Sequence, residues 1–358
     1  MMWKVVEKQI PYLTRSLRNL DRENKEETRA EFCLKTLQEK FSPNPIAVLR
    51  DRKYLSNKQR NYQRKLMGDM KIGFIKKLEK AHWMNEKEKD AVVKRAKEIK
   101  IRIGEHENYF DDTILNDLNV DMVKPRSESF LGLLAQATRN HQTSRFKLLE
   151  ELTLEDPIND KAGIPYYHEK SNSIIVPTIA VDGFFWADDR IPNYLNYAKS
   201  AGFAFTEFLG SISKNGYAGE NHNFSGFSNE TTKIIMDTIA CLLIQSKNDT
   251  LNDNQLQVQY MVLQMFGEQI AHAVYQNWEA HNKKEPRLIG LDYSPLQLFW
   301  IASTNCHIVK EGSSGVFEEL QTPKYINQRS RMNNPDFAKD FNCALGTKMN
   351  PVHKCKFL

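Results

Sequence analysis

Two charged segments in the first half of the chain have apolar residues at helical spacing, and this pattern constrains the fold most strongly. In residues 65–79 and 85–103, apolar side chains recur every three to four positions and charged side chains fill the other faces. The pattern is typical of amphipathic helices that bury one face. Gly104 is expected to cap the second helix. We therefore predict a helical domain over residues 1–150.

The composition supports a globular protein of about two domains. The chain has 358 residues, 41% of them hydrophobic, and its 19 Phe, 13 Tyr and 5 Trp exclude disorder as the main state. At roughly 150 residues per domain, this length corresponds to about two domains. The 50 Lys and Arg residues exceed the 45 Asp and Glu residues by only five, so we expect no nucleic-acid partner.

Segments that would target or anchor the chain are absent from the sequence. No stretch approaches the ~18–20 apolar residues of a membrane-spanning helix. The first residues lack the apolar core of a signal peptide. We expect no membrane insertion by this chain itself. It is either a cytosolic protein or a chain that begins downstream of its targeting segment.

The pattern changes in the second half, which we predict to be a separate domain over residues 151–358. Residues 173–177 indicate a short strand or hairpin that stops at a proline. Residues 195–209, 231–245 and 255–277 indicate helices, and the tail from residue 312 is expected to be irregular. The predicted fold class is mainly α with a small β-sheet.

Cysteines and glycosylation sequons bear on the compartment. The five cysteines show no CxxC spacing, and three of them fall in the last 53 residues. Sequons begin at Asn223, Asn229 and Asn248, and three within 28 residues favour a secreted glycoprotein. Free cytosolic thiols are the alternative.

Several short motifs of the second half follow one another in a recognisable order. They are IIVPTIAVDGFF at residues 174–185, TEFLG at 206–210, GEQIA at 267–271, FNC at 341–343, MNP at 349–351 and CKFL at 355–358. This order resembles the neprilysin and endothelin-converting enzyme family of zinc endopeptidases, whose members carry IVFPAGILQPPFF, HExxH, GENIAD, FHC, MNP and CRVW. The resemblance implies a thermolysin-like zincin catalytic lobe, preceded by part of a helical lid domain in an N-terminally truncated chain.

The resemblance also implies that the zinc site is degenerate. HExxH places two zinc-binding histidines on one helix face, with a glutamate that activates the bound water. The aligned residues here are Thr206, Glu207 and Gly210, so the glutamate is kept and both histidines are lost. Glu268 remains at the position of the third ligand. His272 replaces the aspartate that orients a ligand histidine.

Other catalytic positions of the family have changed as well. Ile164 and Pro165 stand where the family has the asparagine and alanine that bind the substrate backbone. Gln321 stands at the position of the histidine that stabilises the transition state. Loss of ligands, substrate clamp and oxyanion donor together implies an inactive site that needs no cofactor.

The resemblance assigns the cysteines in part. Family members pair their final cysteine with one in a helix after the zinc motif, and these positions correspond to Cys355 and Cys241. Cys306 and Cys343 resemble cysteines whose partners precede the matched region. Cys33 has no counterpart, and we expect it to be a buried free thiol.

Three functions follow as hypotheses. The first is a non-catalytic pseudo-peptidase that binds a peptide or protein ligand, in the extracellular space or as a plasma-membrane ectodomain. The second is an active metalloendopeptidase that holds zinc through Glu207, Glu268 and His272. The third is an intracellular helical scaffold. The sequence leaves the ligand and the oligomeric state open.

Overall fold

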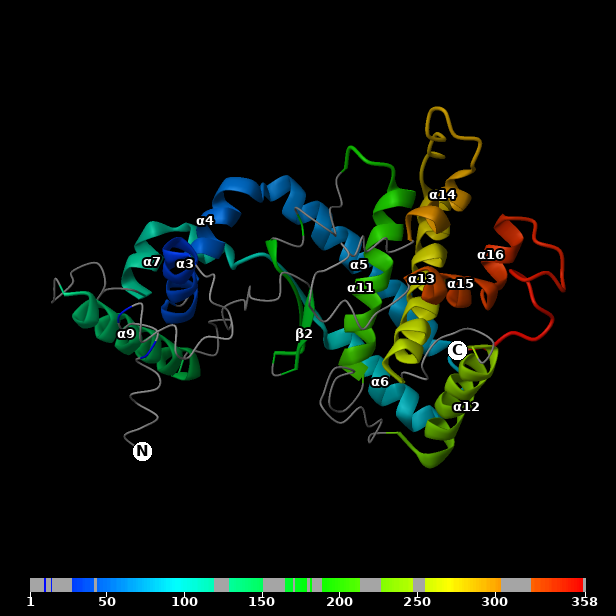
Figure 1. Cartoon of the computed structure of the whole chain (residues 1–358), viewed down its shortest axis with the longest axis horizontal. Coiled ribbons are helices and arrows are strands. Elements are labelled where there is room, and N and C mark those ends of the chain that lie inside the picture. The colour runs from blue at the N-terminus through cyan, green and yellow to red at the C-terminus, as the bar shows by residue number, and fades with distance from the viewer. Residues whose placement is uncertain are drawn as a thin grey trace. The chain divides into compact units, whose positions relative to one another are not determined.

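The computed structural model of the chain is mainly helical, with one small sheet (Figure 1). The structure describes residues 10, 14, 28–41, 44–118, 129–150, 165–169, 171–178, 181, 189–212, 227–246, 255–303 and 323–356. It divides into two compact units. One combines Met1–Leu49 with Glu107–Pro157, and the other combines Arg50–His106 with Ile158–Leu358.

The smaller unit is built from helices alone in its described part. They are α3 (Arg29–Lys40), the first part of α4 (Pro45–Tyr54), the 3₁₀-helix η2 (Glu107–Phe110), α7 (Asp112–Leu118) and α9 (Phe130–Glu150). A capping box starts α3, because the Thr28 hydroxyl accepts from the Glu31 backbone N–H and the Glu31 carboxylate accepts from the Thr28 backbone N–H. Cys33 lies on this helix as an exposed free thiol. The expectation that it is buried was therefore wrong, since this part of α3 is exposed, as the neighbouring Leu34 is too.

The larger unit holds the sheet and the long helices. Its elements are α5 (Asn57–Glu79), α6 (Glu86–Glu98), β1 (Lys100–Ile103), β2 (Tyr166–His168), β3 (Ser173–Val176), α11 (Asn193–Ile212), α12 (Asn229–Ser246), α13 (Gln255–His281), α14 (Pro295–Ala302), α15 (Pro323–Met332) and α16 (Pro335–Asp340). The predicted strand and the three predicted helices of the second half are confirmed. Two short helices, α15 and α16, lie where an irregular tail was expected.

The sheet has the strand order β1-β3-β2. β1 runs parallel to β3, with Ile103 opposite Val176, and β2 runs antiparallel to β3. The prediction of one helix over residues 85–103 was wrong at its end. Parallel pairing with β3 outweighs helical periodicity at the isoleucines of residues 99–103. Gly104 adopts φ +65° after this strand and does not cap a helix.

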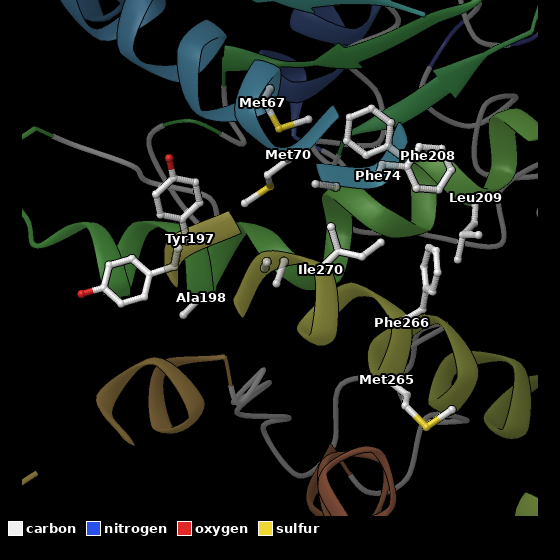
Figure 2. Close-up of a cluster of buried hydrophobic side chains, with 14 of the residues drawn as sticks. Met67, Met70, Phe74, Tyr197, Ala198, Phe208, Leu209, Met265, Phe266 and Ile270 are labelled. Carbon is white, nitrogen blue, oxygen red and sulfur yellow. The ribbon is translucent and has the colours of Figure 1, made fainter. Parts of the chain in front are cut away.

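The core of the larger unit lies where α5, α11 and α13 pack together (Figure 2). Phe74 of α5 stacks on Phe208 of α11, with ring centroids 5.3 Å apart, and meets Phe266 of α13 edge-on at 6.0 Å. All three rings are fully buried. This packing fixes α11 and α13, the two helices that hold the candidate site residues. Among the described residues, no helix is long and apolar enough to cross a membrane.

Candidate functional site

Glu207 projects from α11 toward the sheet. One of its carboxylate oxygens, Oε2, accepts a hydrogen bond of 2.5 Å from the backbone N–H of Tyr167 in β2. Burial raises the pKa of Glu207 to about 7, and the Tyr167 N–H offsets only part of this effect. The side chain is therefore a carboxyl group that changes charge near neutral pH.

Thr206 and Gly210, which align with the two zinc-binding histidines of the family, offer little to a metal ion. Gly210 is buried in α11 and has no side chain. The backbone of Thr206 belongs to the same helix, and its side chain lies outside the described residues. Its hydroxyl would be a weak neutral ligand in place of an imidazole.

Glu268 is held in a dense network on α13, with 1% of its surface exposed. The Ser330 hydroxyl donates to Oε2 at 2.6 Å, and the Ser303 hydroxyl donates to Oε1 at 3.0 Å. Arg331 places Nη2 at 3.1 Å and Nε at 3.3 Å from the same Oε1. The amide of Gln264 adds a contact at 3.2 Å. Both carboxylate oxygens thus already have donors, and their charge is balanced by a guanidinium.

The alternative ligand set requires His272 to bind one metal ion together with Glu207 and Glu268. The contacts of His272 are instead with Asp340 and Trp300. Its Nε2 lies 2.7 Å from Oδ2 of Asp340, and its ring stacks on Trp300 with centroids 4.8 Å apart. The Trp300 indole N–H donates to the same Asp340 oxygen at 2.8 Å. His272 is therefore a fully buried residue tied to α16 and α14.

The donor set does not fit a zinc ion. No group of three His, Cys, Asp or Glu side chains in the described part of the chain is placed to hold a metal, so Glu207, Glu268 and His272 are not brought together. The cation of Arg331 lies against the carboxylate that would have to coordinate the ion. A second cation at that oxygen would be repelled and would displace its hydrogen bonds from Arg331, Ser303 and Gln264.

The remaining predicted residues are only partly placed. Pro165 is buried directly before β2. Asn229 is exposed at the first position of α12. Ile164, Gln321, Asn223, Asn248 and Cys306 lie outside the described residues.

The structure contains a disulfide between Cys241 and Cys355, the pair that the family resemblance implies. It joins α12 to the C-terminal segment across 114 residues of sequence. Cys343 is a free, partly exposed thiol.

Ser303, Ser330, Arg331 and Asp340 were missed by the sequence analysis. Arg331 meets Glu268 across 63 residues of sequence, and Asp340 meets His272 across 68. No local spacing pattern signals such contacts. The available signal was Glu268 itself, because a carboxylate in the middle of a mostly apolar helix needs a partner elsewhere in the chain.

Comparison with known proteins identifies the family. The models described as "Peptidase family M13" match residues 165–357 and, for the N-terminal part, residues 1–106. Neprilysin-2 of Drosophila melanogaster is 26% identical over 315 residues, which cover 78% of this chain and 38% of the relative. Endothelin-converting enzyme 1 of Rattus norvegicus is 22% identical over 386 residues, which cover 99% of this chain and 49% of the relative. The chain therefore spans less than half the length of these relatives.

Solved structures share the fold. The open state of the zinc metalloprotease Zmp1 of Mycobacterium tuberculosis superposes with a TM-score of 0.70 at 12% identity, covering 98% of this chain and 56% of that one. A Haemonchus galactose-containing glycoprotein complex gives 0.68 at 19% identity, covering 92% and 54%. With the family models matching most of the sequence, this chain belongs to peptidase family M13, the family of neprilysin and the endothelin-converting enzymes.

Proposed function

We propose that this protein is a non-catalytic member of its family that binds peptides or proteins without cleaving them. The observation that carries the proposal is the environment of Glu268. Its carboxylate is bonded to Arg331, Ser303 and Ser330 in the place where the family binds zinc. Without metal-activated water, a lone Glu207 is a weak catalyst of peptide hydrolysis.

The sheet supports peptide binding at the retained site. Within the described residues β2 pairs with β3 alone, and we propose that an extended peptide adds to its other edge. Glu207 occupies one backbone donor of that strand, at Tyr167. An incoming peptide carbonyl would compete with this carboxylate for the N–H, so we expect Glu207 to affect peptide affinity in place of hydrolysis.

We also propose an extracellular location, either secreted or as a plasma-membrane ectodomain. The Cys241–Cys355 disulfide is typical of oxidising compartments. Asn229 is exposed at the start of α12, as a glycan acceptor must be. Glycan at Asn229 and an oxidised Cys241–Cys355 pair in protein from its natural source would support this location. Five free thiols would contradict it.

The test of function separates binding from cleavage. A fluorogenic peptide substrate of neprilysin is incubated with the full chain in the presence of zinc, and both anisotropy and product are followed. We expect saturable binding without product, and a changed affinity but no change in turnover for Glu207→Gln. Hydrolysis that disappears in Glu207→Gln would show instead an active metalloendopeptidase with atypical ligands.

A further inference from the structure

A groove rich in lysine lies on the side of α13 opposite the Glu268 network. It is formed within the larger unit by α5, α13 and the C-terminal segment, and its volume is about 960 Å³. Glu268 and His272 are four residues apart on one face of α13. The groove residues Gln269, Ala273 and Asn277, also spaced by four, lie on another. The groove is therefore separate from the degenerate zinc site.

Positive charge is concentrated along this groove. Six lysines line it against two aspartates, in a chain whose net charge is only +5. The lysines are Lys65, Lys76, Lys77, Lys80, Lys354 and Lys356. Such a concentration of one sign in a concave surface raises the local concentration of anions.

The two aspartates leave most of this charge unbalanced. Asp69 accepts a hydrogen bond from the Tyr197 hydroxyl at 2.8 Å, and Asp336 interacts electrostatically with Lys77. Lys65, Lys76 and Lys80 form no ion pair with any described residue. Burial lowers the pKa of Lys77, the neighbouring Lys80 lowers it further, and Asp336 acts in the opposite direction.

The groove also has an apolar wall and unused amides. Ile72, Ile270, Val274 and Trp278 line it beside the lysines. Gln269 and Asn277 line it too, and their carboxamides make no hydrogen bond within the described residues. A carboxamide both donates and accepts, so it suits a peptide backbone. Lysine is a compact point charge suited to single carboxylates, and the lining, as far as the structure describes it, contains no arginine fork for bidentate phosphate binding.

We propose that this groove binds an acidic peptide segment that carries an apolar side chain. The lysines of α5 and of the C-terminal segment attract its carboxylates, and Gln269 and Asn277 bond to its backbone. Its apolar side chain packs on the wall that includes Trp278. The volume falls in the range of ligand sites in proteins, roughly 300–1,000 Å³. This site is distinct from the β2 edge and does not depend on the function proposed there.

The close packing of α5 on α13 makes the groove a preformed feature. Gly73 of α5 lies so near α13 that an added Cβ would overlap Val274 and press on Ile270 at 3.1 Å. The two walls are thus held at a fixed spacing by backbone approach. A preformed site loses less entropy on binding than a flexible one.

Fluorescence anisotropy of the full chain tests the proposal. The probe is a fluorescein-labelled peptide of glutamates with one leucine and one phenylalanine, and its control has every glutamate replaced by glutamine. We expect saturable binding of the acidic probe that weakens as salt is raised. We expect at least ~10-fold weaker binding of the glutamine control, as several lost charge contacts would give.

Variants locate the binding. Lys76→Glu with Lys80→Glu should weaken the acidic probe by ~10-fold or more, and the milder Lys76→Gln with Lys80→Gln should weaken it less. The matched control, Lys87→Glu with Lys94→Glu, changes two exposed lysines of α6 outside the groove and should leave affinity unchanged. A change in tryptophan emission on binding should be lost in Trp278→Phe.

Three results would overturn the proposal. They are the absence of saturable binding, equal affinity for the glutamine control, and equal loss of affinity in the α6 control variant. Binding of a sulfated polysaccharide without binding of the acidic probe would likewise overturn it. The groove would then be a general polyanion site that does not recognise a peptide. Circular dichroism establishes that each variant is folded before its affinity is compared.

Discussion

The two glutamates that the family places at its zinc ion have opposite environments in this protein. Glu268 is enclosed by four donor side chains, one of them the Arg331 cation. Among the described residues Glu207 has one donor, the Tyr167 backbone N–H, and its pKa is raised to about 7. The comparison shows that two carboxylates near one site can be accommodated in different ways. One carboxylate is stabilised by an internal cation, and the other is able to take up a proton.

Removal of Arg331 should lower the free energy of unfolding more than any other change at these two glutamates. Arg331→Met leaves Glu268 buried without a cation, which typically costs about 3–5 kcal/mol. Urea unfolding followed by circular dichroism measures this loss. Glu268→Gln in the same background should recover part of it, since no buried charge then remains. Arg287→Met, on an exposed arginine, is the matched control and should change stability by less than about 0.5 kcal/mol. A loss of stability below about 1 kcal/mol in Arg331→Met would contradict the claim that Arg331 stabilises the buried Glu268 carboxylate.

The next largest effect should be the pH dependence of stability that Glu207 causes. Its folded pKa of about 7 lies above the ordinary value of 4.5, so the folded state binds more protons between these two values. Stability is then highest at the acidic end of this window and falls as pH rises through about 7, by at most about 3 kcal/mol from this group. Glu207→Gln removes the charge and should flatten this part of the curve. Thermal unfolding of both proteins from pH 5 to pH 8 measures the difference. Identical slopes would show that Glu207 is not desolvated.

Removal of a single donor from Glu268 should have the smallest effect. Ser330→Ala deletes the shortest bond to the carboxylate, at 2.6 Å, and is expected to cost about 1–2 kcal/mol because other donors remain. Ser200→Ala is the control, since that buried hydroxyl donates to the Asn196 carbonyl within its own helix. Equal losses of stability in Ser330→Ala and Ser200→Ala would mean that the hydrogen bond to Glu268 contributes no more than that of an ordinary buried hydroxyl.

Sequence reasoning predicted the elements better than their contacts. The helical periodicity and the apolar run at residues 173–177 gave α5, α11, α12, α13 and β3, because those signals are local. The C-terminal end of α6 was misjudged, since the strand at residues 100–103 depends on β3, which lies about 70 residues away in sequence. Glu207 and Glu268 were identified through family motifs. Arg331 was not, because its contact with Glu268 comes from the packing of α15 on α13.

The zinc content of the purified full chain tests the central claim most directly. The protein is dialysed against excess zinc, passed through a desalting column and analysed by mass spectrometry for bound metal. Our account predicts zinc far below one equivalent, and no increase in thermal stability on addition of zinc. One equivalent of zinc that is lost in Glu268→Ala would contradict it, because Glu268 would then be a metal ligand and not the partner of Arg331.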